Sequence, residues 1–267
     1  MKSELKAINP TTAENYHVAL GMRYGDPSIE SALEQLRQAQ CENIIVLPLY
    51  PQYAGATTGS TFDAVAKQLM QWRWVPQLHF VNHYHDQPEF IQACANQIKS
   101  YWSQHAKTEK LILSYHGVPE KQLKQGDPYH CQCHKTTRLI AKELGLTSEQ
   151  VQTTFQSRFG KAKWLEPYTD ATLIKLAKMG TRSVSVFCPG FSADCLETLE
   201  EIAVENKGYF LDNGGQQFEY IPCLNDNLDH MQALVNLVTP LLSYWEQQGQ
   251  REGHLCQELA KQLGASH

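Results

Sequence analysis

The chain lacks the long apolar run that a membrane-spanning helix needs. Such a helix takes about 20 mostly apolar residues, and no run in the 267-residue sequence approaches that length. The opening residues, Met1-Lys-Ser-Glu-Leu-Lys6, also lack the apolar core of a secretory signal. We therefore expect a cytoplasmic protein. These features do not decide whether the chain touches a membrane surface as a peripheral protein.

A basic surface for nucleic acids is missing as well. The sequence has 23 lysines and arginines against 28 aspartates and glutamates, which gives a formal net charge of -5. Proteins that bind DNA or RNA neutralise phosphates with clustered positive charge. The charge balance therefore predicts that nucleic acid is not a partner.

The cysteines lack the spacing of a disulfide framework or a zinc site. Eight of them are scattered along a chain that is 42% hydrophobic and can bury a core without covalent staples. The segment His130-Cys-Gln-Cys-His134 fits neither a c-type haem site nor a zinc knuckle. We expect it in an exposed loop, and His83-Tyr-His85-Asp86 is equally non-specific. Scattered thiols are typical of a reducing compartment.

What the sequence does contain is an alternation of apolar and amphipathic segments. It predicts strands at 18–22, 43–49, 79–82, 111–115, 152–156, 183–188 and 218–221. It predicts helices at 28–40, 60–72, 88–104, 135–144, 170–179, 194–206 and 228–248. Continuous apolar strands between helices indicate an α/β fold with parallel sheets covered on both faces.

The two halves of the chain resemble each other. Three short motifs recur in order, with residue-number differences of 135, 138 and 140: Arg23-Tyr-Gly25 with Arg158-Phe-Gly160, Pro51-Gln-Tyr53 with Pro189-Gly-Phe191, and Asp86 to Ala93 with Asp226 to Ala233. The alternative is that any two α/β halves share such features. A duplication predicts two Rossmann-like halves.

The duplication also predicts an incomplete first half. The second half opens with the strand at 111–115, whose counterpart would precede Met1. The first half is therefore expected to lack its opening strand and helix. We predict a first unit at 1–105, a second at 106–238 and a helical tail at 239–267.

Two residues that can hold a proton or a metal follow apolar strands of the second half. His116 comes after the strand at 111–115, and Glu197 lies at or near the first turn of the helix that follows the strand at 183–188. Ligands of open α/β sheets bind beyond the carboxyl ends of the strands. The pair therefore indicates acid–base or metal chemistry. The alternatives are a structural histidine and a carboxylate that stabilises a helix start.

The counterpart of the Glu197 turn in the first half is the segment 48–60. It has no acid but contains Tyr50 and Tyr53 among small and hydroxyl residues. Such a surface would let a flat aromatic ligand approach closely. The alternative is an ordinary loop between a strand and a helix.

Taken together, an ordered set of motifs resembles bacterial ferrochelatase from about Val18 to Val238. The motifs are Met22-Arg-Tyr-Gly25, Leu49-Tyr-Pro-Gln-Tyr53, Thr57-Thr-Gly59, Ser114-Tyr-His-Gly-Val-Pro119, Gly126-Asp-Pro-Tyr129, Phe155-Gln-Ser-Arg-Phe-Gly160, Trp164-Leu-Glu-Pro-Tyr-Thr-Asp170 and Pro189-Gly-Phe-Ser-Ala-Asp-Cys-Leu-Glu-Thr-Leu199. The resemblance implies two Rossmann-like halves around a porphyrin cleft. It implies insertion of ferrous iron into protoporphyrin IX, the last step of haem synthesis.

The resemblance also implies roles for particular residues. His116 would contact the metal and take pyrrole protons, with Glu197 as its acidic partner. We expect substrate contacts at Tyr24, Tyr50, Tyr53, Thr57, Arg158 and Trp164. Fe2+ would be a substrate, with no tightly bound cofactor. An iron–sulfur cluster, which some members hold through several C-terminal cysteines, is not expected, because the C-terminal tail offers only Cys256.

The sequence departs from the family at its start. The opening strand with a Leu-Gly-Thr-Pro-like turn and the helices that form one lip of the cleft are not present. Three alternatives therefore stay open: a cobalt or nickel chelatase for a related tetrapyrrole, a carrier that binds tetrapyrrole or metal without chemistry, and an inactive fragment of the chelatase.

Overall fold

The second half of the chain forms a four-stranded parallel sheet. The computed structural model describes residues 16–247 and 253–265. The strands are β3 (Lys110–His116), β4 (Val151–Gln156), β5 (Ser183–Phe187) and β6 (Gln217–Ile221), in the order β4-β3-β5-β6. The strand order reverses between the neighbours β3 and β5, which makes their carboxyl ends a topological switch point. His116 pairs with Gln156 at that edge.

Both faces of this sheet are buried, as its apolar strands predict. On β3, Leu111 and Leu113 face a core that also contains Ile98 and Ile140. Ile112, between them, faces the opposite core. Successive side chains of a strand point to opposite faces, so a strand covered on both sides must be apolar throughout.

Helices cover the two faces of the sheet. Helix α4 (Pro88–Gln104) packs against α6 (Tyr129–Glu143), and α7 (Thr169–Lys178) packs against α8 (Lys207–Asp212). The helices after β3 are α5 (Glu120–Lys124), α6 (Tyr129–Glu143), α7 (Thr169–Lys178), the π-helix η3 (Glu197–Asn206), α8 (Lys207–Asp212), α9 (Leu228–Gln247) and α10 (Gly253–Gln262). The predicted fold class, α/β with parallel sheets flanked by helices, is confirmed.

The first half repeats part of this arrangement around a two-stranded sheet. Its elements are α2 (Ile29–Gln38), β1 (Asn43–Val46), the π-helix η2 (Gly55–Gly59), α3 (Ser60–Leu69), β2 (Gln77–Phe80) and α4 (Pro88–Gln104). The register of β1 with β2 starts at Asn43 opposite Gln77, and that of β5 with β6 starts at Ser183 opposite Gln217. The residue numbers of both strands in the second pair are 140 higher than those in the first pair. The sequence repeat is therefore also a repeat of strand pairing.

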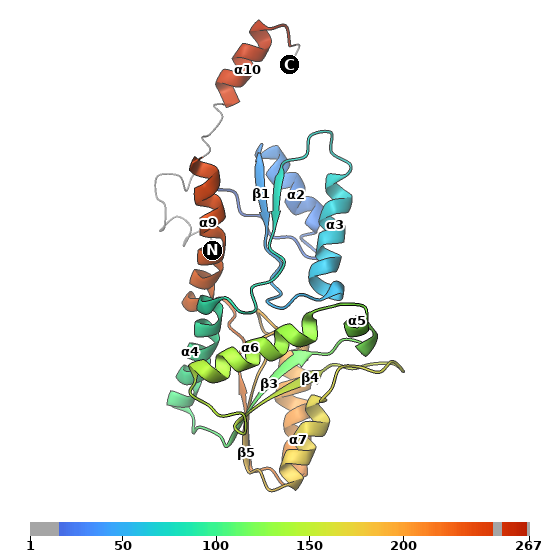
Figure 1. Ribbon diagram of the computed structural model, residues 1–267, viewed down its shortest axis with the longest axis vertical. Coiled ribbons are helices and arrows are strands. Elements are labelled where there is room, and N and C mark those ends of the chain that lie inside the picture. Colours follow the sequence, from blue (N-terminus) through green and yellow to red (C-terminus); the bar gives the residue numbers. More distant parts are fainter. Residues whose placement is uncertain (1–15, 248–252, 266–267) are drawn as a thin grey trace.

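Helices α4 and α9 are counterparts in the repeat and pack against each other. They run along one side of the two sheets (Figure 1). Each carries the same hydrogen bond across one helical turn, from Gln92 to Asn96 and from Gln232 to Asn236, both at 2.8 Å. Asn96 also donates to Asp229 across the helix pair, with a nitrogen–oxygen distance of 2.7 Å.

Some predicted elements are wrong. Residues 18–22 form no strand, and Met22 makes only an isolated bridge to Ser28. The Met22 amide instead donates to the Pro27 carbonyl at 2.7 Å, so the chain turns back on itself. Val18 and Leu20 are exposed, and in the described residues no strand pairs with this segment.

The segment His130–His134 is also not the exposed loop that was expected. It lies in α6, and Cys133 is buried in the core. Asp127 accepts a hydrogen bond from the Tyr129 amide at 2.9 Å, which helps the helix to start before the segment. Helix α9 runs through residue 238, where the second unit was expected to end. The division into three units stays a prediction.

Candidate functional site

His116 and Glu197 follow the two strands at the switch point. His116 is the last residue of β3, and Glu197 is the first residue of the π-helix after β5. The turn after His116 needs a glycine, because a Cβ at Gly117 would lie 2.8 Å from the Gln156 carbonyl oxygen. The Gly117 amide donates to that same oxygen at 2.7 Å. The imidazole is thereby held at the end of the sheet.

The hydrogen bond of the His116 ring assigns its tautomer. Nδ1 lies 2.7 Å from the Gly117 carbonyl oxygen. A carbonyl only accepts, so Nδ1 must carry the hydrogen, which leaves the lone pair on Nε2. The ring is half-buried, and its centroid lies 6.4 Å from that of Phe191. An oriented imidazole with one free lone pair can take a proton or bind a metal.

Glu197 interacts electrostatically with His116. Three interactions lower the pKa of the Glu197 carboxyl: a hydrogen bond from Cys195, one from its own backbone amide, and the electrostatic interaction with His116. Partial burial opposes them without reversing the shift. Glu197 is therefore a carboxylate at neutral pH.

Gln156 links His116 and Glu197, because it is the β-sheet partner of His116 and bonds to Glu197. The sequence analysis gave it no role. Its side-chain amide is buried and donates to the Glu197 carbonyl oxygen at 2.8 Å. Its carbonyl oxygen accepts from the Ser114 hydroxyl at 2.7 Å. The sequence feature that could have identified Gln156 is its position as the last residue of an apolar strand, just before the turn at Ser157 and Arg158. Such a position faces the switch point.

We expect Gln156→Met to lower the free energy of unfolding by about 1–3 kcal/mol. Methionine keeps the volume, but it removes the partner of the Glu197 carbonyl, and a buried polar group left without its bond costs about that much. Urea denaturation checks this. The control is Gln152→Met on the same strand, whose side chain is half-buried and should change stability by less than about 0.5 kcal/mol. Equal effects would contradict the role of Gln156.

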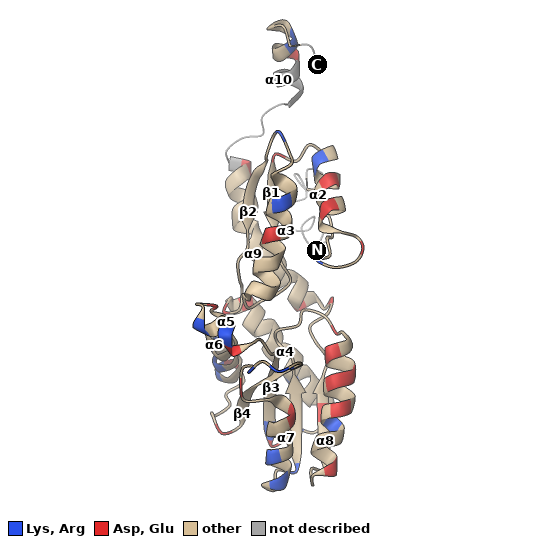
Figure 2. Cartoon of the chain, turned by 90° about the vertical axis from the view of Figure 1, so that its right-hand side faces the viewer, with Lys and Arg blue, Asp and Glu red and all other residues tan. Residues whose placement is uncertain are grey.

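The helix that begins at Glu197 has π geometry over ten residues. Such segments are rare and frequently occur at functional sites. Glu201 is turned toward the end of β4, where it accepts from the Ser157 amide at 2.7 Å and from its hydroxyl. Glu200 is exposed. Acidic residues lie along this helix (Figure 2).

The helix has no side-chain cap, and Asp194 instead joins two loops. It accepts from the Asn225 side chain at 2.7 Å and from the Cys223 amide at 3.2 Å, and also from the Tyr220 hydroxyl. Burial of Asp194 opposes ionisation, yet these hydrogen bonds still lower its pKa. The loop that leads to Glu197 is thereby tied to the loop after β6.

Two predicted substrate residues of the second half are engaged within the chain. Arg158 is exposed and makes a bidentate ion pair with Asp170, with both distances 2.7 Å. Its guanidinium lies 4.1 Å from the Tyr168 ring centroid. Trp164 is buried, and its indole donates to the Phe159 carbonyl at 2.9 Å. Whether either residue contacts a substrate stays a prediction.

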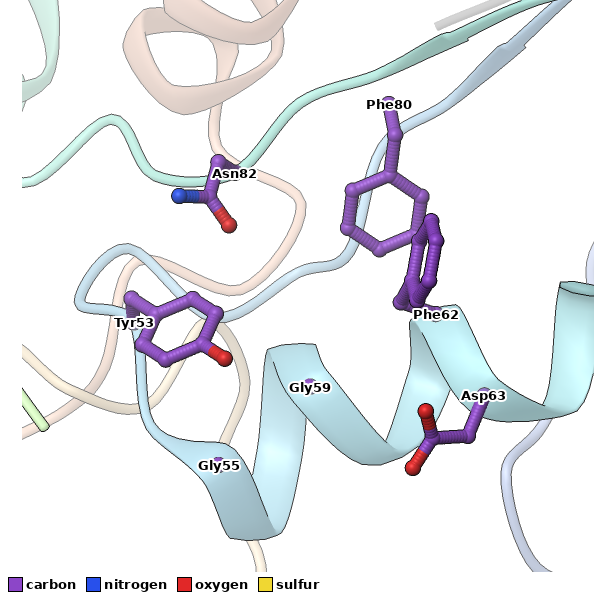
Figure 3. Close-up of a pocket in the computed structure, with 7 residues that line it drawn as sticks. All are labelled: Tyr53, Gly55, Gly59, Phe62, Asp63, Phe80 and Asn82. Carbon is purple, nitrogen blue, oxygen red and sulfur yellow. The ribbon is translucent and has the colours of Figure 1, made fainter. Parts of the chain in front are cut away.

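Of the residues predicted in the first half, Tyr53 lines a cavity of about 420 Å3. Figure 3 shows Tyr53 and Asn82 facing Phe62 and Phe80 above the glycines of η2. His116 and Glu197 are not among its lining residues. Apolar rings beside small residues are suited to a flat ligand.

The other three first-half residues are placed around the same loop. Tyr24 is strongly exposed, with Arg23 stacked 4.7 Å from its ring centroid. Burial raises the pKa of Tyr50. The Thr57 hydroxyl donates to the Ala54 carbonyl at 3.3 Å inside the turn of η2. Their contact with a substrate stays a prediction.

The first-half loop is held against the second half. The Tyr53 amide donates to the Gln132 side chain, and the Gly55 amide donates to Asp127, both at 2.7 Å. On the other side, the Ser192 hydroxyl donates to the Leu49 carbonyl at 2.8 Å. The motif around Asp127 therefore serves to join the halves.

The fold is an α/β fold of the chelatase type. Two solved structures share the fold: SirB from Bacillus subtilis with Fe3+, at a TM-score of 0.60, and the sirohydrochlorin chelatase SirB from its subspecies spizizenii in complex with cobalt, at 0.58. Each is 13% identical in sequence and covers 88% of this chain, and the chain covers 87% and 86% of them. The family model described as Ferrochelatase matches residues 1–241. The chain belongs to the ferrochelatase family.

Relatives with curated names support this membership. "Ferrochelatase" of Marinobacter nauticus is 54% identical over 241 residues, which are 90% of this chain and 65% of the relative. "Ferrochelatase 2" of Shewanella oneidensis is 54% identical over 244 residues, 91% of this chain and 75% of the relative. The chain thus spans roughly two thirds to three quarters of these relatives' length. Across residues 16–247 and 253–265, no helix combines the length and apolar character needed to cross a membrane.

Proposed function

We propose that the chain inserts ferrous iron into protoporphyrin IX to form haem. The observation that carries the proposal is the His116–Glu197 pair at the switch point, in a chain of the ferrochelatase family. The free Nε2 of His116 and the ionised Glu197 face the place where sheets of this type bind ligands. The first half supplies aromatic and small residues in the cavity that Tyr53 lines, which His116 and Glu197 do not line.

The chemistry requires a proton acceptor. A free-base porphyrin carries two pyrrole N–H groups, and both protons must leave as a divalent metal enters. Nε2 of His116 can take one proton, and the Glu197 carboxylate stabilises the imidazolium that results. The second proton passes to Glu197 or to water. Base catalysis of this kind contributes about 10²–10⁴ in rate.

The pair also suits a metal that must leave the protein. Closed structural sites use four protein ligands, whereas sites with few ligands keep positions open for exchange. One imidazole and one carboxylate bind a borderline ion such as Fe2+ weakly enough to release it. The metal is here a substrate, and we propose that the chain has no resident cofactor and no iron–sulfur cluster. The Cys256 side chain lies outside the described residues.

The remaining sequence-based expectations form part of the same proposal. Tyr24, Tyr50, Tyr53, Thr57, Arg158 and Trp164 are the proposed porphyrin contacts. The proposed partners are protoporphyrin IX and ferrous iron, without nucleic acid, in the cytoplasm. The net charge of -5 supports the exclusion of nucleic acid.

Zinc insertion into a water-soluble porphyrin tests the function. Zinc avoids the oxidation of ferrous iron, and the free-base absorption bands give way to those of the metalloporphyrin. We expect a rate proportional to the concentration of the purified chain. Anaerobic assays with Fe2+, Co2+ and Ni2+ then test the metal, with Fe2+ expected to react fastest. Porphyrin binding without any change of the bands would contradict the proposal and identify a carrier.

A further inference from the structure

The loop between β2 and α4 carries a second cluster of metal-binding side chains. The donor atoms of His83, His85 and Asp86 all lie within 4.8 Å of one another. The imidazole centroids of the two histidines are 4.9 Å apart. This cluster is the segment that the sequence analysis found suggestive but non-specific, and the proposed chelatase chemistry does not use it.

His85 has an unused nitrogen in a buried position. The residue is 4% exposed, and Nδ1 has no hydrogen-bond partner. Buried polar atoms without partners are rare, and each calls for an explanation such as a missing ion. Nδ1 lies 3.8 Å from an Asp86 carboxylate oxygen, Oδ1.

The surroundings hold these groups in place. The other Asp86 oxygen, Oδ2, accepts from Lys135 of α6 at 2.5 Å, which turns Oδ1 toward His85. The His85 carbonyl accepts from the Thr136 hydroxyl at 2.8 Å. Tyr84, between the histidines, is buried, with its hydroxyl 3.3 Å from that of Ser192. Hydrogen bonds of this kind orient metal ligands in known sites.

We propose that His83, His85 and Asp86 bind a first-row divalent cation at a site distinct from the His116–Glu197 pair. Two imidazoles and one carboxylate are a ligand set found with iron and zinc, whereas Mg2+ and Ca2+ prefer oxygen ligands alone. Metal–ligand distances of about 2.0–2.2 Å place ligand atoms roughly 3.0–3.5 Å apart. The exposed His83 can close the remaining gap by rotating about its side-chain bonds.

Cobalt binding to the full chain tests the site. The background variant is His116→Ala, so that the first metal site does not contribute. Co2+ titration, followed by visible absorption and calorimetry, should show one saturable equivalent that Zn2+ displaces and Mg2+ does not. Adding His83→Ala should weaken binding at least tenfold, because one of three ligands is lost. Adding Asp86→Asn, which changes no volume, should weaken it similarly.

The matched control is His130→Ala. His130 and His134 are a second close histidine pair among the described residues, with ring centroids 4.5 Å apart on α6, and could chelate cobalt by themselves. Loss of His130 breaks this pair and should leave the affinity unchanged. Binding that survives His83→Ala and Asp86→Asn in a folded protein, or that disappears with His130→Ala, would overturn the proposal. Circular dichroism of each variant verifies the fold, and these outcomes do not depend on chelatase activity.

Discussion

Replacing His116 by alanine is expected to reduce zinc insertion at least about a hundredfold while porphyrin binding persists. Nδ1 of the His116 imidazole is engaged in a hydrogen bond with the Gly117 carbonyl. The lone pair on Nε2 is therefore free to accept a proton. Losing a general base costs about 10²–10⁴ in rate. Porphyrin binding depends on surface area and aromatic contacts, which the change leaves in place. Steady-state zinc insertion and porphyrin fluorescence measure the two effects separately.

Two further variants make this result specific. Glu197→Gln keeps the shape but removes the carboxylate, and we expect a smaller loss of rate because His116 remains. His105→Ala removes an exposed histidine at the end of α4 and should leave the rate unchanged. If His116→Ala retains full turnover, the base lies elsewhere. If the wild-type chain binds porphyrin but shows no turnover either, the chain is a carrier or an inactive fragment of the chelatase.

Gly117→Ala is expected to lower the free energy of unfolding by about 1–3 kcal/mol and to slow metal insertion strongly. The new Cβ would lie 2.8 Å from the Gln156 carbonyl oxygen and 3.2 Å from the Trp164 ring. Overpacking of this kind costs about that much. The Gln156 oxygen is a backbone atom, so relief requires the ends of β3 and β4 to separate. That movement would displace His116, the pairing partner of Gln156.

Gly208→Ala is the matched control for this prediction. Gly208 lies in α8, where an added Cβ meets nothing within 4 Å. The same substitution should there be neutral or stabilise the protein by about 0.4–1 kcal/mol, because alanine favours a helix. Urea unfolding and zinc insertion on both variants check the pair. Wild-type stability and turnover for Gly117→Ala would show that the strand ends tolerate a side chain.

Much of the fold could be predicted from local pattern. The strand at 111–115 is apolar at both odd and even positions, which only a sheet covered on both faces requires. The similarity of Asp86–Ala93 to Asp226–Ala233 correctly identified α4 and α9 as equivalent helices of the two halves, because both start from equivalent turns. The spacing of apolar residues in these strands and helices reflects which of their faces are buried, and it can therefore be read from the sequence.

Other features could not be predicted because they depend on distant neighbours. Residues 18–22 have the composition of a strand, but a strand forms only where another strand can accept its hydrogen bonds. The π geometry from Glu197 to Asn206 leaves no known signature in hydrophobic spacing. The hydrogen bond from Gln156 to Glu197 joins residues 41 positions apart in the sequence.

For the site, the sequence by itself determined which groups are available and on which edge of the sheet they lie. His116 and Glu197 each follow an apolar strand, and parallel strands end at one edge. Only the tertiary structure decided which atoms are free to react. It assigned the lone pair of His116 to Nε2 through Gly117, and it left Nδ1 of the buried His85 without a partner. Hydrogen bonding depends on distances between groups that the chain brings together only on folding.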